Sequence, residues 1–188
     1  MEQESTYSAF AGEELISSGN LNTMLADVKA AFDRDPSTLF LIFEDETGRQ
    51  VDFDLRGSLE QVQARAVPRP PKTGPGRPKL GVTSREISLL PRHWAWLEQQ
   101  PSGASAALRR LIDDARKLDP DEQRTRQAKE ALVRIMSAIA GNLPGYESAC
   151  RSLYTDDRTE FAELVRNWPK DIHAYLIKRA DEACPVTV

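Results

Sequence analysis

The spacing of apolar residues predicts a small α+β unit at the N-terminal end of the chain. From Leu21 to Phe32 apolar residues recur at helical spacing, and Asn20 or Asn22 can cap this helix. The uninterrupted apolar run from Leu39 to Phe43 is typical of a central strand. A helix and a strand this close together indicate a unit in which helix packs on sheet.

Two further strands are expected in the same unit. Between residues 51 and 55, apolar residues alternate with Asp52 and Asp54, which predicts a strand with its apolar side facing inward. Residues 7–17 are expected to form another strand or a hairpin. The acidic residues at positions 44–46, with those of the alternating strand, are interpreted as a solvated turn and outer face, because a calcium loop would need a glycine and a glutamate that are absent.

The last third of the chain has helical spacing throughout. Asp119-Pro120-Asp121-Glu122 combines a capping aspartate, a proline for the first helical position and a glutamate three residues after the cap. These signals predict a helix that extends to Gly141, and three shorter helices are expected around Leu153, Val165 and Leu176.

Proline and charge mark the boundaries between the parts. Residues 67–80 hold five prolines, two glycines and four basic residues, a composition that excludes a regular helix or sheet. We therefore expect an α+β protein in four segments: an acidic α+β domain (1–66), a basic linker (67–81), a central module (82–118) and an all-helical C-terminal region (119–188).

Net charge supports this division. The whole chain carries a net charge of −4, but residues 67–118 contain 10 basic and 4 acidic side chains. The segment before them has 5 basic and 13 acidic side chains, and the segment after them has 10 and 12. Positive charge is thus concentrated in the middle of the chain, as expected if that segment meets an anion.

Several function classes are disfavoured. The two cysteines lack metal-ligand or disulfide spacing, and no signal peptide or membrane-spanning run is visible, so we expect a cytoplasmic protein that does not enter a membrane. His93 and His173 are far apart in sequence, and no nucleophile elbow or phosphate-binding glycine loop accompanies them. We expect neither a cofactor nor an enzyme.

The central module has a recognisable order of elements. A short strand from Ser84 to Leu90 leads into Pro91, which fits the first turn of a helix over 92–100. After the turn that includes Gly103, Ser105 is a suitable N-cap for a second helix with apolar residues at i, i+3, i+4 and i+7. This order resembles the ribbon-helix-helix family of bacterial repressors and antitoxins. The resemblance rests on three features: a strand that ends in Leu-Pro, a Gly-x-Ser turn, and a second helix that begins with Leu108-Arg109.

That resemblance implies a homodimer that binds double-stranded DNA. Two chains pair their strands into a ribbon that enters the major groove, with four helices packed behind it. The implied dimer core is apolar and consists of Ile87, Leu89, Trp94, Leu97, Leu108, Leu111 and Ile112. The residues implied to face the bases are Ser84, Glu86 and Ser88, and a phosphate clamp is implied at Ser102, Gly103, Ser105 and Arg109.

The basic linker offers a second contact with DNA. Gly76-Arg77-Pro78 resembles the core of an AT-hook, which lies in a narrow minor groove, although Pro75 stands where a basic residue is usual. The four linker cations assigned to this contact are Arg69, Lys72, Arg77 and Lys79.

The hypothesis from these features is a homodimeric, DNA-binding transcriptional regulator whose outer domains sense a ligand or hold a protein partner. An alternative stays open, because the outward strand face bears two serines and a glutamate where the family usually has arginine, lysine, asparagine or glutamine. In that alternative the ribbon-helix-helix serves only to dimerise an antitoxin-like or other protein-binding chain.

The chain as a whole also resembles a family of uncharacterised bacterial proteins. The likeness is carried by Phe10-Ala11-Gly12, Asp52 to Gly57, Gly76 to Trp94, Asn167-Trp168-Pro169 and Asp171-Ile172. It implies a family label and segment boundaries, without an activity.

Overall fold

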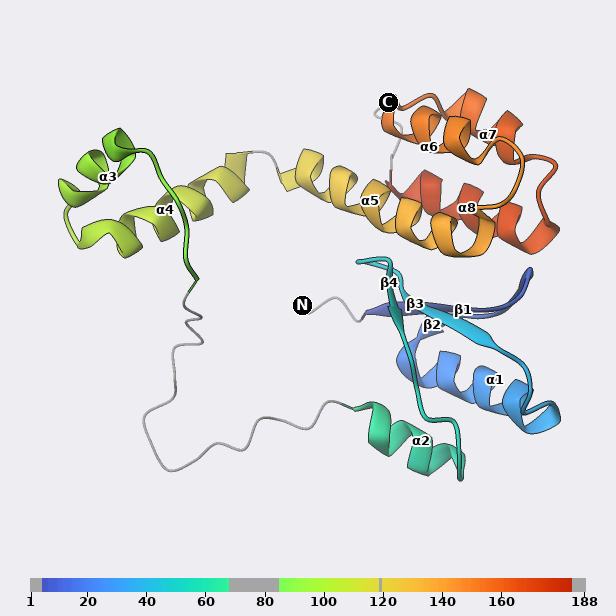
Figure 1. Ribbon diagram of the computed structural model, residues 1–188. Helices are drawn as coiled ribbons and strands as arrows, with labels where there is room; N and C mark the ends of the chain where they lie inside the picture. Colours follow the sequence, from blue (N-terminus) through green and yellow to red (C-terminus); the bar gives the residue numbers. More distant parts are fainter. Residues whose placement is uncertain (1–4, 68–84, 119, 184–188) are drawn as a thin grey trace. The chain divides into compact units, whose positions relative to one another are not determined.

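The computed structural model describes residues 5–67, 85–118 and 120–183 (Figure 1). The expected α+β class is confirmed, with one four-stranded antiparallel sheet and eight helices in the described residues. The strands are β1 (Thr6–Ala11), β2 (Glu14–Asn20), β3 (Phe40–Glu44) and β4 (Arg49–Val51). The helices are α1 (Leu21–Arg34), α2 (Leu59–Ala66), α3 (Pro91–Glu98), α4 (Gly103–Leu118), α5 (Pro120–Ala140), α6 (Tyr146–Tyr154), α7 (Arg158–Val165) and α8 (Lys170–Ala183).

The described residues belong to two compact units. Unit 1 combines Met1–Pro68 with Arg124–Val188, and unit 2 is Arg69–Gln123. We had expected the N-terminal domain and the helical C-terminal region to be separate segments. The structure instead brings them together around a shared core, with unit 2 inserted between them in the sequence.

The sheet of unit 1 has the strand order β2-β1-β3-β4. Its first two strands form the hairpin expected at residues 7–17, turning at Gly12 with a φ of +58° that glycine adopts without steric strain. The strand expected at residues 51–55 was wrong in extent, because β4 ends at Val51. Its predicted alternation is nevertheless present: Leu55 is buried, whereas Asp52 and Asp54 are exposed.

One face of the sheet is covered by α1. Of the two expected caps Asn20 is the one used, since its Oδ1 accepts a hydrogen bond from the Thr23 amide at 3.0 Å. The helix buries Met24, Leu25 and Val28 against strand residues that include Ala9 and Ile42. Helix α2, which the apolar spacing did not reveal, adds Val62 to this cluster and begins with a capping box between Ser58 and Gln61.

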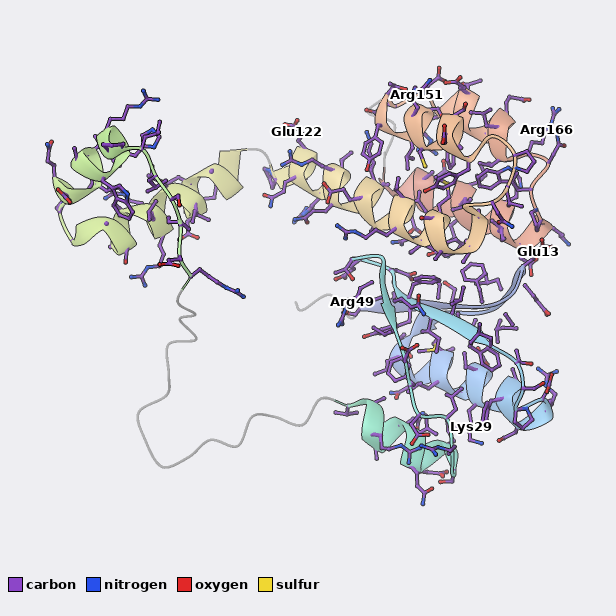
Figure 2. All side chains as sticks on the ribbon, in the orientation of Figure 1. Glu13, Lys29, Arg49, Glu122, Arg151 and Arg166 are labelled. Carbon is purple, nitrogen blue, oxygen red and sulfur yellow. The ribbon has the colours of Figure 1, made fainter. Side chains whose placement is uncertain are left out.

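The opposite face of the sheet is covered by the C-terminal helices (Figure 1). Because neighbouring side chains alternate between the two faces of a strand, Ala9 points toward α1 and Phe10 points away from it. Phe10 and Phe43 pack in one buried cluster with Ile135 and Met136 of α5 and with residues of α6, α7 and α8. Figure 2 shows side chains filling the layer between these helices and the sheet.

Polar contacts fix the turn between β3 and β4 against these helices. Tyr175 Oη donates to Asp45 Oδ1 at 3.0 Å, and Arg179 Nη2 donates to the Asp45 carbonyl at 2.8 Å. Arg134 Nη1 donates to the Thr47 carbonyl at 2.7 Å. The expectation of a solvated acidic turn was therefore wrong for Asp45, which is 2% exposed.

Unit 2 contains the two helices expected in the central module. Helix α3 starts at Pro91, and α4 follows after a short turn. Two details differ from expectation. Ser105 does not cap the second helix, because α4 already begins at Gly103 and Ser105 lies in its first turn. Residues 85–90 form no strand within the single chain, and Ser84 lies outside the described residues.

None of the described helices combines the length and apolar character that crossing a bilayer requires.

Candidate functional site

Unit 2 has almost no hydrophobic core of its own. Among residues 85–118, the buried hydrophobic side chains are Leu97 and Ala107, which are 3% and 2% exposed. By contrast, unit 2 holds six of the nine large hydrophobic side chains that are exposed in the described residues. They are Ile87, Leu90, Trp94, Trp96, Leu111 and Ile112. Within the described part of unit 2, the short segment and two helices therefore leave an apolar face that they do not cover themselves.

The amphipathic character of α4 explains this exposure. Leu108, Leu111, Ile112 and Ala115 share one side of the helix, and α3 is only eight residues long, too short to cover that side. Ile112, at 56% exposed, is the most open of the large side chains there. The expected dimer-core residues thus divide into one that the chain buries by itself, Leu97, and six that remain partly or largely accessible.

A groove of about 470 Å³ runs between α3, α4 and the segment before α3. Most of its lining is apolar, and the lining residues are Leu89, Arg92, His93, Trp96, Leu97, Leu108 and Leu111. Four of them belong to the expected dimer core. Arg92, His93 and Trp96 were not assigned to it, although His93 lies four residues before Leu97 and therefore on the same side of α3.

The residues expected to face DNA bases lie before α3. Glu86 and Ser88 are exposed. Ile87, which lies between them, and Arg85, which precedes Glu86, are exposed as well. The Leu90 carbonyl then accepts hydrogen bonds from the amides of His93 and Trp94, which closes the first turn of α3. The outer surface of this segment is consequently open to a strand or a ligand in the single chain.

The expected phosphate clamp lies at the start of α4. Ser102 and Gly103 both have left-handed backbone, with φ of +81° and +78°, and both are exposed. The Gly103 amide donates to the Gln100 carbonyl at 3.2 Å, and Arg109 Nε donates to the Ser105 carbonyl at 3.1 Å. The turn and the arginine therefore lie within the first two turns of one helix, where amide groups and the helix dipole favour an anion.

The four cations assigned to the linker lie outside the described residues. They are Arg69, Lys72, Arg77 and Lys79. Their contribution to a nucleic-acid interface rests on the sequence alone.

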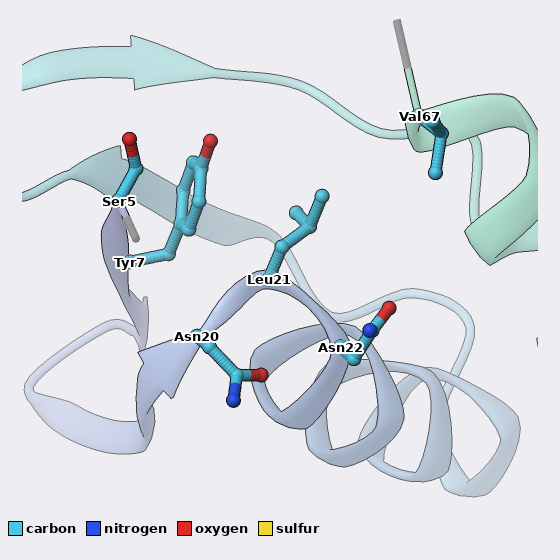
Figure 3. A pocket seen from close by; sticks show the side chains of 6 residues that line it. All are labelled: Ser5, Tyr7, Asn20, Leu21, Asn22 and Val67. Atoms are coloured by element: carbon cyan, nitrogen blue, oxygen red, sulfur yellow. The ribbon is translucent and has the colours of Figure 1, made fainter. Parts of the chain in front are cut away.

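Two of the hollows in unit 1 differ in character. One, of about 300 Å³, lies beside the start of α1 (Figure 3) and is lined by Ser5, Tyr7, Asn20, Leu21, Asn22 and Val67. Burial, and then the nearby carboxylate of Glu44, raise the pKa of the Tyr7 hydroxyl. The other hollow, of about 540 Å³, lies between α5 and α8 and includes Arg179, which already pairs with Glu182 at 2.6 Å.

Neither of these two hollows presents a recognisable catalytic or metal-binding group. Among the described residues, no group of three or more histidine, cysteine, aspartate or glutamate side chains is placed to hold a metal ion. Burial raises the pKa of the Cys150 thiol, which disfavours the reactive thiolate form. His173 lies half-buried on α8, and His93 lies in unit 2.

Comparison with known protein families gives a match to one family over most of the chain. Residues 6–180 match a family described as an uncharacterized protein conserved in bacteria (DUF2239). The chain belongs to this family. The match spans both halves of unit 1 and all of unit 2. No curated protein and no solved structure matches the chain.

Proposed function

We propose that this protein is a homodimeric, DNA-binding transcriptional regulator that uses unit 2 as a ribbon-helix-helix module. The observation that carries the proposal is the burial pattern of unit 2, in which two hydrophobic side chains are buried and six large hydrophobic side chains are exposed. Such a unit gains a core only by packing its apolar face on another surface. A second copy supplies a surface of the same size and character, and two-fold pairing of identical patches is the commonest form of assembly.

The segment before α3 supports the same arrangement. Residues 85–90 have no strand partner among the residues that the structure describes, and pairing with the same segment of a second copy would satisfy their backbone groups. In the resulting ribbon Glu86 and Ser88 point outward, where a major groove accepts two strands. The turn at Ser102 and Gly103, with Arg109, then holds a phosphate and fixes the ribbon over the bases.

Charge supports DNA as the ligand. Residues 67–118 carry a net charge of +6 in a chain whose total is −4. Arg109 and the linker cations would neutralise phosphates and release bound counterions, so binding should weaken steeply as salt rises.

The dimer is tested by sedimentation equilibrium of the full chain. Ile112→Glu places a carboxylate on the apolar face at a side chain that is already half exposed, so the fold of one chain tolerates it while the dimer does not. The matched control is Leu39→Glu, at a side chain of unit 1 that is 78% exposed. We expect the first variant to be monomeric and the second to resemble the unchanged protein.

DNA binding is tested by fluorescence anisotropy with a random duplex at two salt concentrations. Replacing Arg77, Lys79 and Arg109 by alanine should reduce affinity on the order of tenfold or more at low salt and flatten the salt dependence. The control replaces three exposed cations of unit 1 and so removes the same charge: Arg151 and Arg166, which are labelled in Figure 2, and Lys178. Its affinity should be nearly unchanged.

One observation favours a second function, in which unit 2 only joins two chains that bind another protein. The outward positions before α3 carry Glu86 and Ser88, and a carboxylate near phosphates opposes binding. A dimer that shows no DNA binding at low salt would support this second function and overturn the regulator.

A further inference from the structure

The groove of unit 2 joins an apolar wall to a positive charge. The wall is built from the indole of Trp96 and from leucines of all three elements around it. These leucines are Leu89 before α3, Leu97 in α3, and Leu108 and Leu111 in α4. Trp96 and Leu111 are 46% and 44% exposed, so much of the wall faces solvent. An apolar molecule that displaced this water would be bound favourably.

Arg92 supplies the positive charge. It is exposed and lies in the first turn of α3, where its Nε donates to Nε2 of the neighbouring His93 at 3.5 Å. The acidic side chains that the structure describes on these three elements are exposed and lie outside the lining. They are Glu86, Glu98, Asp113 and Asp114. A guanidinium presents its donors in a fork that matches a carboxylate, so a carboxylate is the polar group that this edge of the groove suits.

The size and make-up of the groove are those of a small-molecule site. Such sites typically occupy about 300–1,000 Å³ and are lined by apolar side chains with a few polar groups that fix the orientation of the ligand. This groove measures about 470 Å³, with five apolar lining residues and two polar ones. A nucleic-acid phosphate would meet Arg92 but leave the leucines and Trp96 uncovered, so nucleic acid does not suit this site.

We propose that the groove is a binding site for a small amphipathic carboxylate. The hydrocarbon part of the ligand lies along the leucines and Trp96, and its carboxylate pairs with Arg92. The inference goes beyond the proposed function, because such binding requires one copy of unit 2 and no DNA. Straight-chain fatty acids have this chemistry, and decanoate is the probe that we choose.

A second copy of the chain is the rival occupant. Four of the lining residues belong to the expected dimer core, so a second copy that covered the groove would exclude decanoate. Ile112→Gln separates the two occupants. Ile112 is 56% exposed on the apolar face and lies outside the lining, so an amide there disfavours self-association without changing the groove or its charge.

Isothermal titration calorimetry at neutral pH, with decanoate ionised and below its micelle concentration, measures the affinity of the unchanged full chain and of Ile112→Gln. Arg92→Gln removes the positive charge, and Arg110→Gln is the matched control at an exposed arginine of α4 outside the lining. Arg92→Gln should weaken decanoate binding roughly 3- to 10-fold, as expected for an exposed charge pair of good geometry, and Arg110→Gln should leave it nearly unchanged. Decanol has the same chain without the charge, so its affinity should not depend on Arg92.

Tryptophan fluorescence locates the bound decanoate. The chain has three tryptophans, and besides Trp96 these are Trp94, outside the lining, and Trp168, buried in unit 1. Decanoate should change the emission of the unchanged protein, and this change should be lost in Trp96→Phe but kept in Trp94→Phe. Circular dichroism verifies that each variant retains its helices.

Decanoate binding that weakens in Arg92→Gln and is reported by Trp96 would support the inference. No binding to either the unchanged chain or Ile112→Gln would overturn it, as would binding that Arg92→Gln leaves unaltered. Binding by Ile112→Gln alone would show that a second copy occupies the groove of the unchanged protein, which overturns the inference as well. Each of these failures leaves the proposed homodimer and its DNA binding standing. Conversely, a monomer that binds decanoate but no DNA would overturn the proposed function and support this inference.

Discussion

Tyr175 donates a hydrogen bond from its hydroxyl to Asp45 Oδ1 at 3.0 Å, across 130 residues of sequence. Asp45 follows β3 and Tyr175 lies on α8, so the contact joins the sheet to the last helix. Both side chains are buried, and Arg179 binds the Asp45 carbonyl beside them. The two halves of unit 1, which the sequence separates by all of unit 2, are therefore held together by a polar contact within their apolar layer.

Removing this hydroxyl should destabilise unit 1 while leaving its shape intact. Tyr175→Phe takes one donor from a buried carboxylate, which by comparison with other buried hydrogen bonds lowers the free energy of unfolding by about 1–3 kcal/mol. Urea denaturation monitored by circular dichroism measures the change. Tyr154→Phe, at an exposed tyrosine, is the control and should leave the midpoint nearly unchanged.

Because of the same hydroxyl, we expect the folded protein to lose stability in alkaline solution. Burial, and next the Asp45 carboxylate, raise the pKa of Tyr175 in the folded protein. A raised pKa means that the fold favours the neutral hydroxyl, so its contribution is complete below the unfolded tyrosine pKa of about 10. It is lost as pH rises from there toward the folded value. Urea midpoints measured upward from about pH 9 should fall more steeply in the unchanged protein than in Tyr175→Phe; equal slopes would contradict the assignment.

Gly48 should be irreplaceable at the turn between β3 and β4. A Cβ there would lie 2.3 Å from the Ala131 carbonyl oxygen and 2.8 Å from the Ala131 Cα, in the backbone of α5. Gly12 provides a matched control, since its φ of +58° is close to the +64° of Gly48 but its Cβ would meet open space. Gly12→Ala should cost about 1–2 kcal/mol, the penalty for left-handed backbone. Gly48→Ala should cost clearly more, because α5 must also move, and equal thermal midpoints for the two variants would show that no such contact exists.

Local signals allowed much of the fold to be predicted. The uninterrupted apolar run at Leu39 to Phe43 predicted a central strand, and β3 is indeed buried on both faces. Asn20 and Pro120 marked helix starts that the structure confirms. Helix α2 was missed because Val62 is its one buried residue, which gives almost no periodicity, although Ser58 and Gln61 are a recognisable capping box.

Long-range pairing could not be predicted in the same way. A strand that is apolar on both faces needs a second covering layer, but apolar spacing does not say which helices supply it. Asp45 was expected in a solvated acidic turn because the features of a calcium loop are absent, but its burial depends on Tyr175 and Arg179 near the other end of the chain. In the candidate site, His93 was interpreted as a surface or dimer-interface residue rather than a catalytic base, but a polar pair on a short helix does not indicate that it borders an apolar groove.

The shared core of unit 1 predicts that its two halves fold only together. A fragment of residues 1–67 would expose Phe10 and Phe43, and a fragment of residues 120–188 would expose Ile135 and Met136. Full burial of each such side chain is worth about 1.5–3 kcal/mol, so losing several of them exceeds the stability that a small domain normally has in reserve. Each fragment alone should lack a cooperative unfolding transition.

A chain without unit 2 tests the same point from the other side. Replacing residues 69–119 by a glycine-serine linker of about 30 residues, with a mean span of roughly 30 Å, keeps both halves of unit 1 connected. This chain should unfold cooperatively in urea and retain the near-ultraviolet signal of the buried Trp168 and Tyr175. If residues 1–67 instead unfolded cooperatively as an isolated fragment, the sheet and α1 would be a domain in their own right. The C-terminal helices would then be an accessory layer rather than half of one core.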